Sequence, residues 1–279
     1  MNKRSGLGFT LVELLVVIAI IALLMAVLLP ALNRAREQGK RAVCLYYQRQ
    51  MASAWMMYAD DNGDKIICGD AEEYGDWETS TGAYSCVAPI GNHCREKPWV
   101  LRDWDGTLTL AQKKDQITNG ALFRYVKDLK AYKCPRANAD ETRSFSVVDA
   151  MNVTVIAGAS PSGVGSGAVL IKNRQQIKKT YERMIFVDDG GVQGKTEGGW
   201  TVYVTRLAWW DLPSARHGDG TTFSFTDGHA EYHKWVENST FDAIRIGIAG
   251  TSNPAYPSSK DIRWSSIVAW GSDVAGKGN

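Results

Sequence analysis

The chain has 279 residues, with 32 basic and 30 acidic side chains and a formal net charge of +2. This near-neutral balance favours neither a nucleic acid nor a strongly acidic molecule as a partner, and we expect no nucleic-acid binding. Once the apolar N-terminal segment is set aside, roughly 220 residues remain, which is enough for one large domain or two small ones.

The first feature in chain order is an apolar run in which Glu13 is the only charged residue between Leu11 and Leu32. A run of about 20 apolar residues is long enough to span a bilayer as a helix. Lys3 and Arg4 precede the run and favour a cytoplasmic N-terminus, with the polar remainder of the chain outside the cytoplasm. More basic residues follow the run than precede it, so charge counting alone leaves the orientation ambiguous. The following ones are Arg34, Arg36, Lys40 and Arg41.

An ordinary signal anchor or a cleaved secretory peptide would explain this hydrophobicity equally well. Two details disagree with both: no small-x-small cleavage site follows the run, and Glu13 lies near its start. A lone carboxylate in lipid is costly unless it is paired or neutralised, so an intramembrane carboxylate indicates function. Glu13 is therefore a candidate functional residue.

Residues 3–21, KRSGLGFTLVELLVVIAII, resemble the class III leader of type IV pilins and type II secretion pseudopilins. The resemblance implies cleavage between Gly8 and Phe9 by a prepilin peptidase on the cytoplasmic side, usually followed by N-methylation of Phe9. Glycine suits the cleavage position because a missing Cβ lets a protease approach the backbone. The resemblance also implies that Glu13 pairs with the Phe9 amino group of a neighbouring subunit, which would neutralise two charges in lipid. It resolves the orientation as well, since this family carries basic residues just outside the membrane.

Pro30 follows the apolar run and cannot donate a backbone hydrogen bond to Ala26, so we expect a kink or local melting there. The helix is predicted to resume to about Tyr58 and to end at the Asp-Asp-Asn-Gly-Asp segment 60–64. On a helical wheel its apolar stripe, which should pack on the rest of the chain, lies opposite a polar side. The stripe is Leu32, Val43, Tyr47, Met51, Ala54 and Tyr58, and the polar side is Arg34, Gln38, Arg41, Gln48 and Arg49.

The remaining sequence predicts an irregular, strand-rich head. We expect a helix near residues 108–117, a turn and a strand over 120–135, and β-prone segments over 145–156 and 184–187, the last closed by a turn at Asp188 and Asp189. Residues 44–64 resemble the post-membrane segment of pseudopilin-like proteins with a large β-rich head. The expected fold is α+β, with a long N-terminal helix packed on a mixed, mainly antiparallel head. The expected divisions are a leader (1–8), a transmembrane and assembly helix (9–32), its amphipathic continuation (33–60) and an extracytoplasmic head (61–279).

The segment HGDGTTFSFTDG runs from His217 to Gly228. Asp227-Gly228 between two β-prone runs indicates a two-residue hairpin turn in which both turn residues have positive φ. Phe223 and Phe225 alternate with polar residues, so the face that carries them should be buried. The spacing resembles the H-X9-DG element near the C-terminus of large pilin-like proteins. We expect the element to be structural, with His217 making a hydrogen bond that fixes the incoming chain.

Five cysteines lie outside the membrane in this topology, where disulfides persist. They are Cys44, Cys68, Cys86, Cys94 and Cys134. The odd count leaves at least one thiol free or in an intermolecular bond. Cys86–Cys94 is the first candidate disulfide because the intervening loop is short and contains Gly and Pro, and Cys44–Cys134 is the second. No CxxC pair is present, so neither a zinc knuckle nor a thioredoxin-like site is supported.

Candidate chemistry elsewhere is sparse. His229, Glu231 and His233 alternate, so on a strand they would share a face and could supply zinc ligands, but a solvated hairpin face is the commoner outcome. No catalytic residue and no cofactor are predicted. The ten tryptophans are most often core residues, although exposed ones can stack on sugar rings. They are Trp55, Trp77, Trp99, Trp104, Trp200, Trp209, Trp210, Trp235, Trp264 and Trp270.

Together these features predict a structural, non-enzymatic subunit that crosses the bacterial inner membrane once and reaches the cell surface once assembled. Its expected partners are the prepilin peptidase, the membrane and other pilin or pseudopilin subunits. The alternative is a membrane-anchored carbohydrate-binding or substrate-capturing module that uses exposed tryptophans. A third interpretation is a membrane-tethered hydrolase that uses His229, Glu231 and His233.

Overall fold

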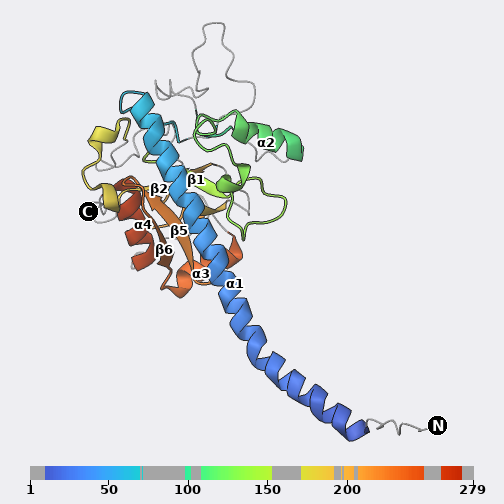
Figure 1. Cartoon of the computed structure of the whole chain (residues 1–279). Coiled ribbons are helices and arrows are strands. Elements are labelled where there is room, and N and C mark those ends of the chain that lie inside the picture. The colour runs from blue at the N-terminus through green and yellow to red at the C-terminus, as the bar shows by residue number, and fades with distance from the viewer. Residues whose placement is uncertain are drawn as a thin grey trace, which may run out of the picture.

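The computed structural model describes residues 10–69, 71, 98–101, 108–152, 171–191, 196, 198–203, 207–247 and 259–271. One helix, α1 (Leu11–Asp61), dominates the arrangement. Figure 1 shows half of it extending away from a globular head and the other half lying across that head. Asn62 caps its C-terminus, and Gly63 and Asp64 follow with φ of 63° and 64°. The helix therefore ends in the segment where left-handed turn residues predict an end.

The helix continues through Pro30 without interruption, so the predicted local melting is wrong. The axis of the protruding half is inclined to that of the half on the head (Figure 1). Proline removes one backbone hydrogen bond and crowds the preceding turn, which bends a helix without ending it when both flanks are strong helix formers.

The two halves of α1 have opposite environments. Every side chain from Leu11 to Leu32 is exposed. The C-terminal half is buried along one face, and the predicted stripe is right for Met51, Ala54 and Tyr58. It is wrong for Leu32 and Val43, which are 46% and 40% exposed, and for Gln48, which the helical wheel places on the polar side but which is fully buried. The buried face is rotated toward Cys44 and Gln48 because both side chains contact Thr222 on a strand with small polar side chains, β5 (Gly220–Phe225).

That strand belongs to a six-stranded sheet of order β3-β1-β2-β5-β6, with β4 paired to β2. Only the β1–β3 pairing is parallel, and the other pairings are antiparallel. The strands are β1 (Phe145–Val148), β2 (Met184–Gly191), β3 (Gly199–Trp200), β4 (Leu212–Pro213), β5 (Gly220–Phe225) and β6 (Ala230–Lys234). This confirms the predicted α+β fold with a mixed, mainly antiparallel sheet.

The shorter helices are α2 (Leu110–Thr118), α3 (Asn238–Ile246) and α4 (Lys260–Trp270), with 3-10 turns η1 (Leu129–Tyr132), η2 (Arg174–Gln176) and η3 (Thr180–Glu182). The first matches the helix expected near residues 108–117. The strand expected before Cys134 is wrong, because η1 occupies that place. The Asp128 side chain accepts a hydrogen bond of 2.9 Å from Lys130 N, which caps a helical turn and not an extended chain.

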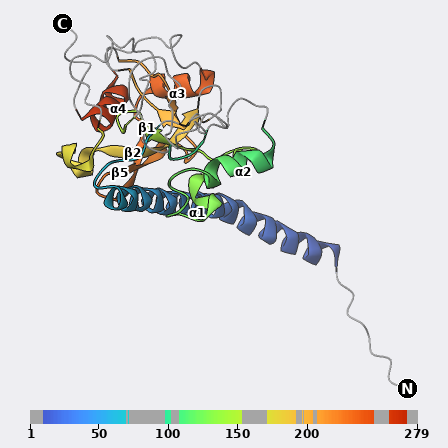
Figure 2. The same cartoon turned by 90° about the horizontal axis from the view of Figure 1, so that it is seen from above.

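The sheet is covered on both faces. Figure 2 shows α1 along one side of it and α3 and α4 on the other. On β5, Thr222 faces α1, while Phe223 and Phe225 belong to the core under α3 and α4. All six residues of β5 are buried, so the expectation of a single buried face is too narrow. A central strand between two helical layers has no solvated side.

Most of the described tryptophans lie in the two hydrophobic cores of the head, one that includes residues of α1 and one under α3 and α4. Among the described residues, six are fully buried, namely Trp55, Trp99, Trp200, Trp209, Trp235 and Trp270. Trp210 and Trp264 are half-buried, and Trp77 and Trp104 lie outside the described residues. The described part of the chain thus offers no exposed tryptophan of the kind that the sugar-binding alternative requires.

Candidate functional site: the exposed helix and a buried cysteine–histidine cluster

The start of α1 is held by a capping box between Thr10 and Glu13. Glu13 Oε2 accepts hydrogen bonds from Thr10 N at 2.8 Å and from Thr10 Oγ1 at 2.7 Å. Glu13 N in turn donates to Thr10 Oγ1 at 3.2 Å. Reciprocal bonds of this kind satisfy backbone donors that a helix start otherwise leaves open. The carboxylate therefore has a local role within one chain, before any contact with a second chain. Gly8 and Phe9, the predicted cleavage and methylation site, lie outside the described residues.

Beyond this cap, the helix presents apolar side chains on all sides to its surroundings. It is long and apolar enough to cross a membrane, and the head buries none of its most apolar stretch. By length and composition alone a signal sequence would look the same. A continuous apolar surface of this size must be covered by lipid or by other chains.

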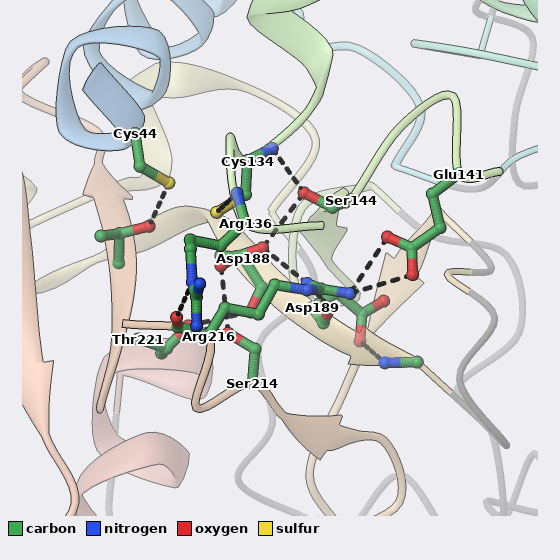
Figure 3. A network of polar contacts seen from close by, with 12 residues as sticks. Cys44, Cys134, Arg136, Glu141, Ser144, Asp188, Asp189, Ser214, Arg216 and Thr221 are labelled. Carbon is green, nitrogen blue, oxygen red and sulfur yellow. Dashed lines mark hydrogen bonds and ion pairs between the residues drawn. The ribbon is translucent and has the colours of Figure 1, made fainter. Parts of the chain in front are cut away.

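A second feature lies where the other half of α1 crosses the sheet. Cys44 from α1, Cys134 from the loop after η1, Asp188 from β2 and His217 from the turn before β5 form a buried cluster. One ligand-type atom from each residue lies within 4.8 Å of those of the other three. We call these four residues the buried cluster. Figure 3 shows Cys44 above the sheet with Cys134 and Asp188 directly across from it.

His217 connects the cluster to α1. Its Nε2 lies 3.2 Å from Cys134 Sγ, and its Nδ1 lies 3.1 Å from Glu37 Oε1. Burial opposes protonation of the imidazole, but its contacts with Cys134 and Glu37 raise the pKa of His217 above 6.5. On the other side of the cluster Cys44 Sγ lies 3.1 Å from Thr222 Oγ1. Burial raises the pKa of the Cys44 thiol well above its usual value.

Asp188 is held by three donors. Its Oδ1 accepts from Arg216 at 2.7 Å and from Ser144 Oγ at 3.1 Å, and its Oδ2 accepts from Ser214 Oγ at 3.1 Å. Figure 3 shows these contacts converging below Cys134. The expectation that Asp188 and its neighbour Asp189 form a turn is wrong, because both are buried residues of strand β2. Burial raises the pKa of Asp189 to about 7.

Comparison with known proteins bears on the exposed helix. A sequence model described as the prokaryotic N-terminal methylation motif matches residues 3–29. The type IV wide pilus major component PilA4 of Thermus thermophilus is 48% identical over 59 residues, which are 21% of this chain and 45% of that protein. The N-terminal segment of the chain is therefore similar to that of a type IV pilin, and the match spans less than half of that relative's length. No solved structure matches the chain.

The segment 217–228 leads into and forms the turn of the β5–β6 hairpin, but with a different turn from the predicted one. Gly228 N donates to Phe225 O at 2.9 Å, and Phe225 N donates to His229 O at 3.0 Å. Gly228 has φ of 92°, whereas Asp227 is not among the residues with positive φ. The turn thus has three loop residues and one left-handed glycine, as in hairpins with a G1 bulge. Asp227 Oδ1 instead accepts from His229 N at 3.1 Å.

His229, Glu231 and His233 do not converge on a common site. His229 contacts Asp227 at 2.5 Å, and Glu231 is exposed. The His233 ring stacks on Trp264 with centroids 3.5 Å apart. Burial lowers the pKa of His233 to about 4. Among the described residues, the buried cluster is the one group of three or more side chains arranged to share a metal ion.

Of the two candidate disulfides, Cys86–Cys94 lies outside the described residues. Cys44 and Cys134 are free thiols whose Sγ atoms lie within 4.8 Å of each other. Sequence reasoning paired these two residues but missed Asp188 and the contact of His217 with them. No short sequence motif could have revealed the cluster, because its members lie far apart in the chain. Cys134 and His217, for example, are separated by 83 residues.

Proposed function

We propose that the chain is a pilin-like structural subunit that is cleaved by a prepilin peptidase between Gly8 and Phe9 and assembles through residues 9–32. The product is a type IV pilus-like or type II secretion pseudopilus filament built with further copies or with other pilin subunits. The observation that carries the proposal is the fully exposed apolar half of α1, which the head leaves uncovered.

Two further observations support it. The methylation-motif match covers residues 3–29, which include Gly8, Phe9 and Glu13. A relative with 48% identity over 59 residues is described as the major component of a wide type IV pilus. Before assembly the same helix would hold the chain in the inner membrane as a single span, with the N-terminus cytoplasmic and the head outside. In the filament, neighbouring helices would replace lipid around it.

The chain covers 45% of that relative, so processing and assembly need a direct test. The protein should be extracted from membranes of cells that contain a prepilin peptidase, and its intact mass and N-terminal sequence measured. We expect a mature chain that begins at Phe9. Gly8→Val should leave the precursor intact, because the added side chain blocks the approach of the protease to the backbone. Gly6→Val, two residues earlier in the same leader, is the matched control and should still be cleaved. A mature chain that begins after Leu29 would instead establish ordinary signal-peptide processing.

A further inference from the structure

We propose that the buried cluster is a structural zinc site in which Cys44, Cys134, His217 and Asp188 bind one Zn²⁺ and fasten α1 to the head. Thiolate sulfur, imidazole nitrogen and carboxylate oxygen are the donor types that zinc takes in proteins, and a structural site takes four of them with tetrahedral geometry. The four residues supply one donor atom each, from four different parts of the fold.

The spacing of the donor atoms fits such a site. Zinc bonds of about 2.3 Å to sulfur and about 2.0 Å to nitrogen or oxygen place neighbouring tetrahedral donors roughly 3.3–3.8 Å apart. The His217 Nε2 to Cys134 Sγ distance is 3.2 Å. All donor atoms of the cluster lie within 4.8 Å of one another, so each pair needs to approach by no more than about 1.5 Å to surround an ion.

The surroundings of His217 and Asp188 match those of metal ligands. A ligating histidine generally donates its other ring N–H to a carboxylate, which fixes the tautomer and aims the free nitrogen at the metal. Glu37 Oε1 lies 3.1 Å from His217 Nδ1 and can accept that hydrogen. Ser144, Ser214 and Arg216 hold the Asp188 carboxylate in place.

A divalent ion would offset most of the negative charge of the cluster. Binding releases one proton from each of the Cys44 and Cys134 thiols and takes His217 as a neutral imidazole, so two thiolates and the Asp188 carboxylate bring three negative charges to the Zn²⁺. Arg216, 2.7 Å from Asp188 Oδ1 and 3.2 Å from Glu141 Oε2, adds positive charge beside them. Without the ion, two thiols and a carboxylate share a site away from water, where negative charge is unfavourable.

The site would add a bond between parts of the chain that lie far apart in the sequence. Cys44 and Glu37 lie on α1 near the point where it leaves the head, and His217 leads into the β5–β6 hairpin. An ion at this point would resist separation of α1 from the sheet when load passes from the helix to the head. A Cys44–Cys134 disulfide could make a related link, but it would leave His217 without a role and would exclude the metal.

The test uses the full-length protein, extracted in detergent and purified with reductant and without chelator. Metal content is measured by elemental mass spectrometry after incubation with ZnSO4 and removal of unbound ion. We expect one zinc per chain, lost in Cys44→Ser, Cys134→Ser and His217→Gln. Cys68→Ser is the matched control, because Cys68 is also buried but does not belong to the cluster. It should keep one zinc per chain.

A second measurement avoids variants that fail to fold. Replacing zinc by Co²⁺ in the unmodified protein should give the intense visible bands of a tetrahedral site and a thiolate-to-cobalt charge-transfer band. Zinc far below one per chain, a cobalt spectrum without the thiolate band, or peptide mapping that finds a Cys44–Cys134 disulfide in the reductant-free protein would each overturn the proposal.

Discussion

Replacing Glu13 by Leu separates the membrane step from the assembly step. The change removes the one charged side chain between Leu11 and Leu32. Membrane insertion should improve, because a charged side chain costs about 2.5–3.5 kcal/mol at the centre of a membrane helix on insertion scales, and less near the end where Glu13 lies. Assembly should nonetheless fail, because the Phe9 amine of a neighbouring subunit would lose its partner.

Glu13→Leu also removes the two hydrogen bonds that Oε2 accepts from Thr10, and a capping contact is worth about 0.3–1.5 kcal/mol. The net improvement in insertion should therefore be at most about 3 kcal/mol. Leaving one partner of a buried ion pair unpaired costs about 3–5 kcal/mol, which weakens each subunit contact by roughly 10²- to 10⁴-fold.

The assay compares the membrane-inserted fraction with the fraction recovered as sheared filaments or as crosslinked oligomers. Thr10→Ala is the matched control, because it removes the hydroxyl contacts of the same capping box but keeps the carboxylate. It should insert and assemble close to normally. Normal assembly of Glu13→Leu would refute the intersubunit pair, and failure of Thr10→Ala to the same degree would assign the defect to the helix cap.

Three further outcomes follow from the head. Gly228→Val should destabilise it by about 1–3 kcal/mol, because a β-branched residue is strained at a φ of 92°; an unchanged thermal midpoint of the detergent-solubilised protein would contradict the turn geometry. A soluble fragment that begins at Asn33 should fold, whereas one that begins at Lys65 should give no cooperative melt, because it lacks Met51, Trp55 and the rest of the buried face of α1. Stability should fall by about 1–3 kcal/mol between pH 7 and pH 4 through His233, whose pKa burial lowers from 6.5 to about 4. A depressed pKa means that the unfolded chain takes up the proton first, so this stability is present above pH 6.5 and is lost on acidification. His233→Gln should flatten the denaturant-measured profile in this window, and an unchanged slope would assign the loss to other groups.

Local sequence patterns were sufficient to predict those helices, strands and helix ends that depend on interactions between residues close together in the chain. The apolar run at 11–32 predicts a helix of membrane length, and the Asp-Gly-rich segment 60–64 predicts its end. The helix near 108–117 and the strand at 184–187 follow from the same kind of periodicity. The turn before β6 was placed correctly but given the wrong type, because an Asp-Gly pair fits several loop lengths and the strand register selects among them.

The sequence by itself determined that residues 11–32 form an apolar helical segment with one carboxylate, because hydrophobicity and charge act along the chain without reference to a partner. Only the tertiary structure decided which face of that helix enters the core. Gln48 can be buried because its Nε2 donates a hydrogen bond of 3.4 Å to Thr222 O. That acceptor lies on another element, so the helical periodicity of α1 could not predict it. The same holds for Cys44, Cys134 and Asp188. Residues far apart in sequence meet only when a sheet brings β2 and β5 under α1, and local patterning carries no record of such a meeting.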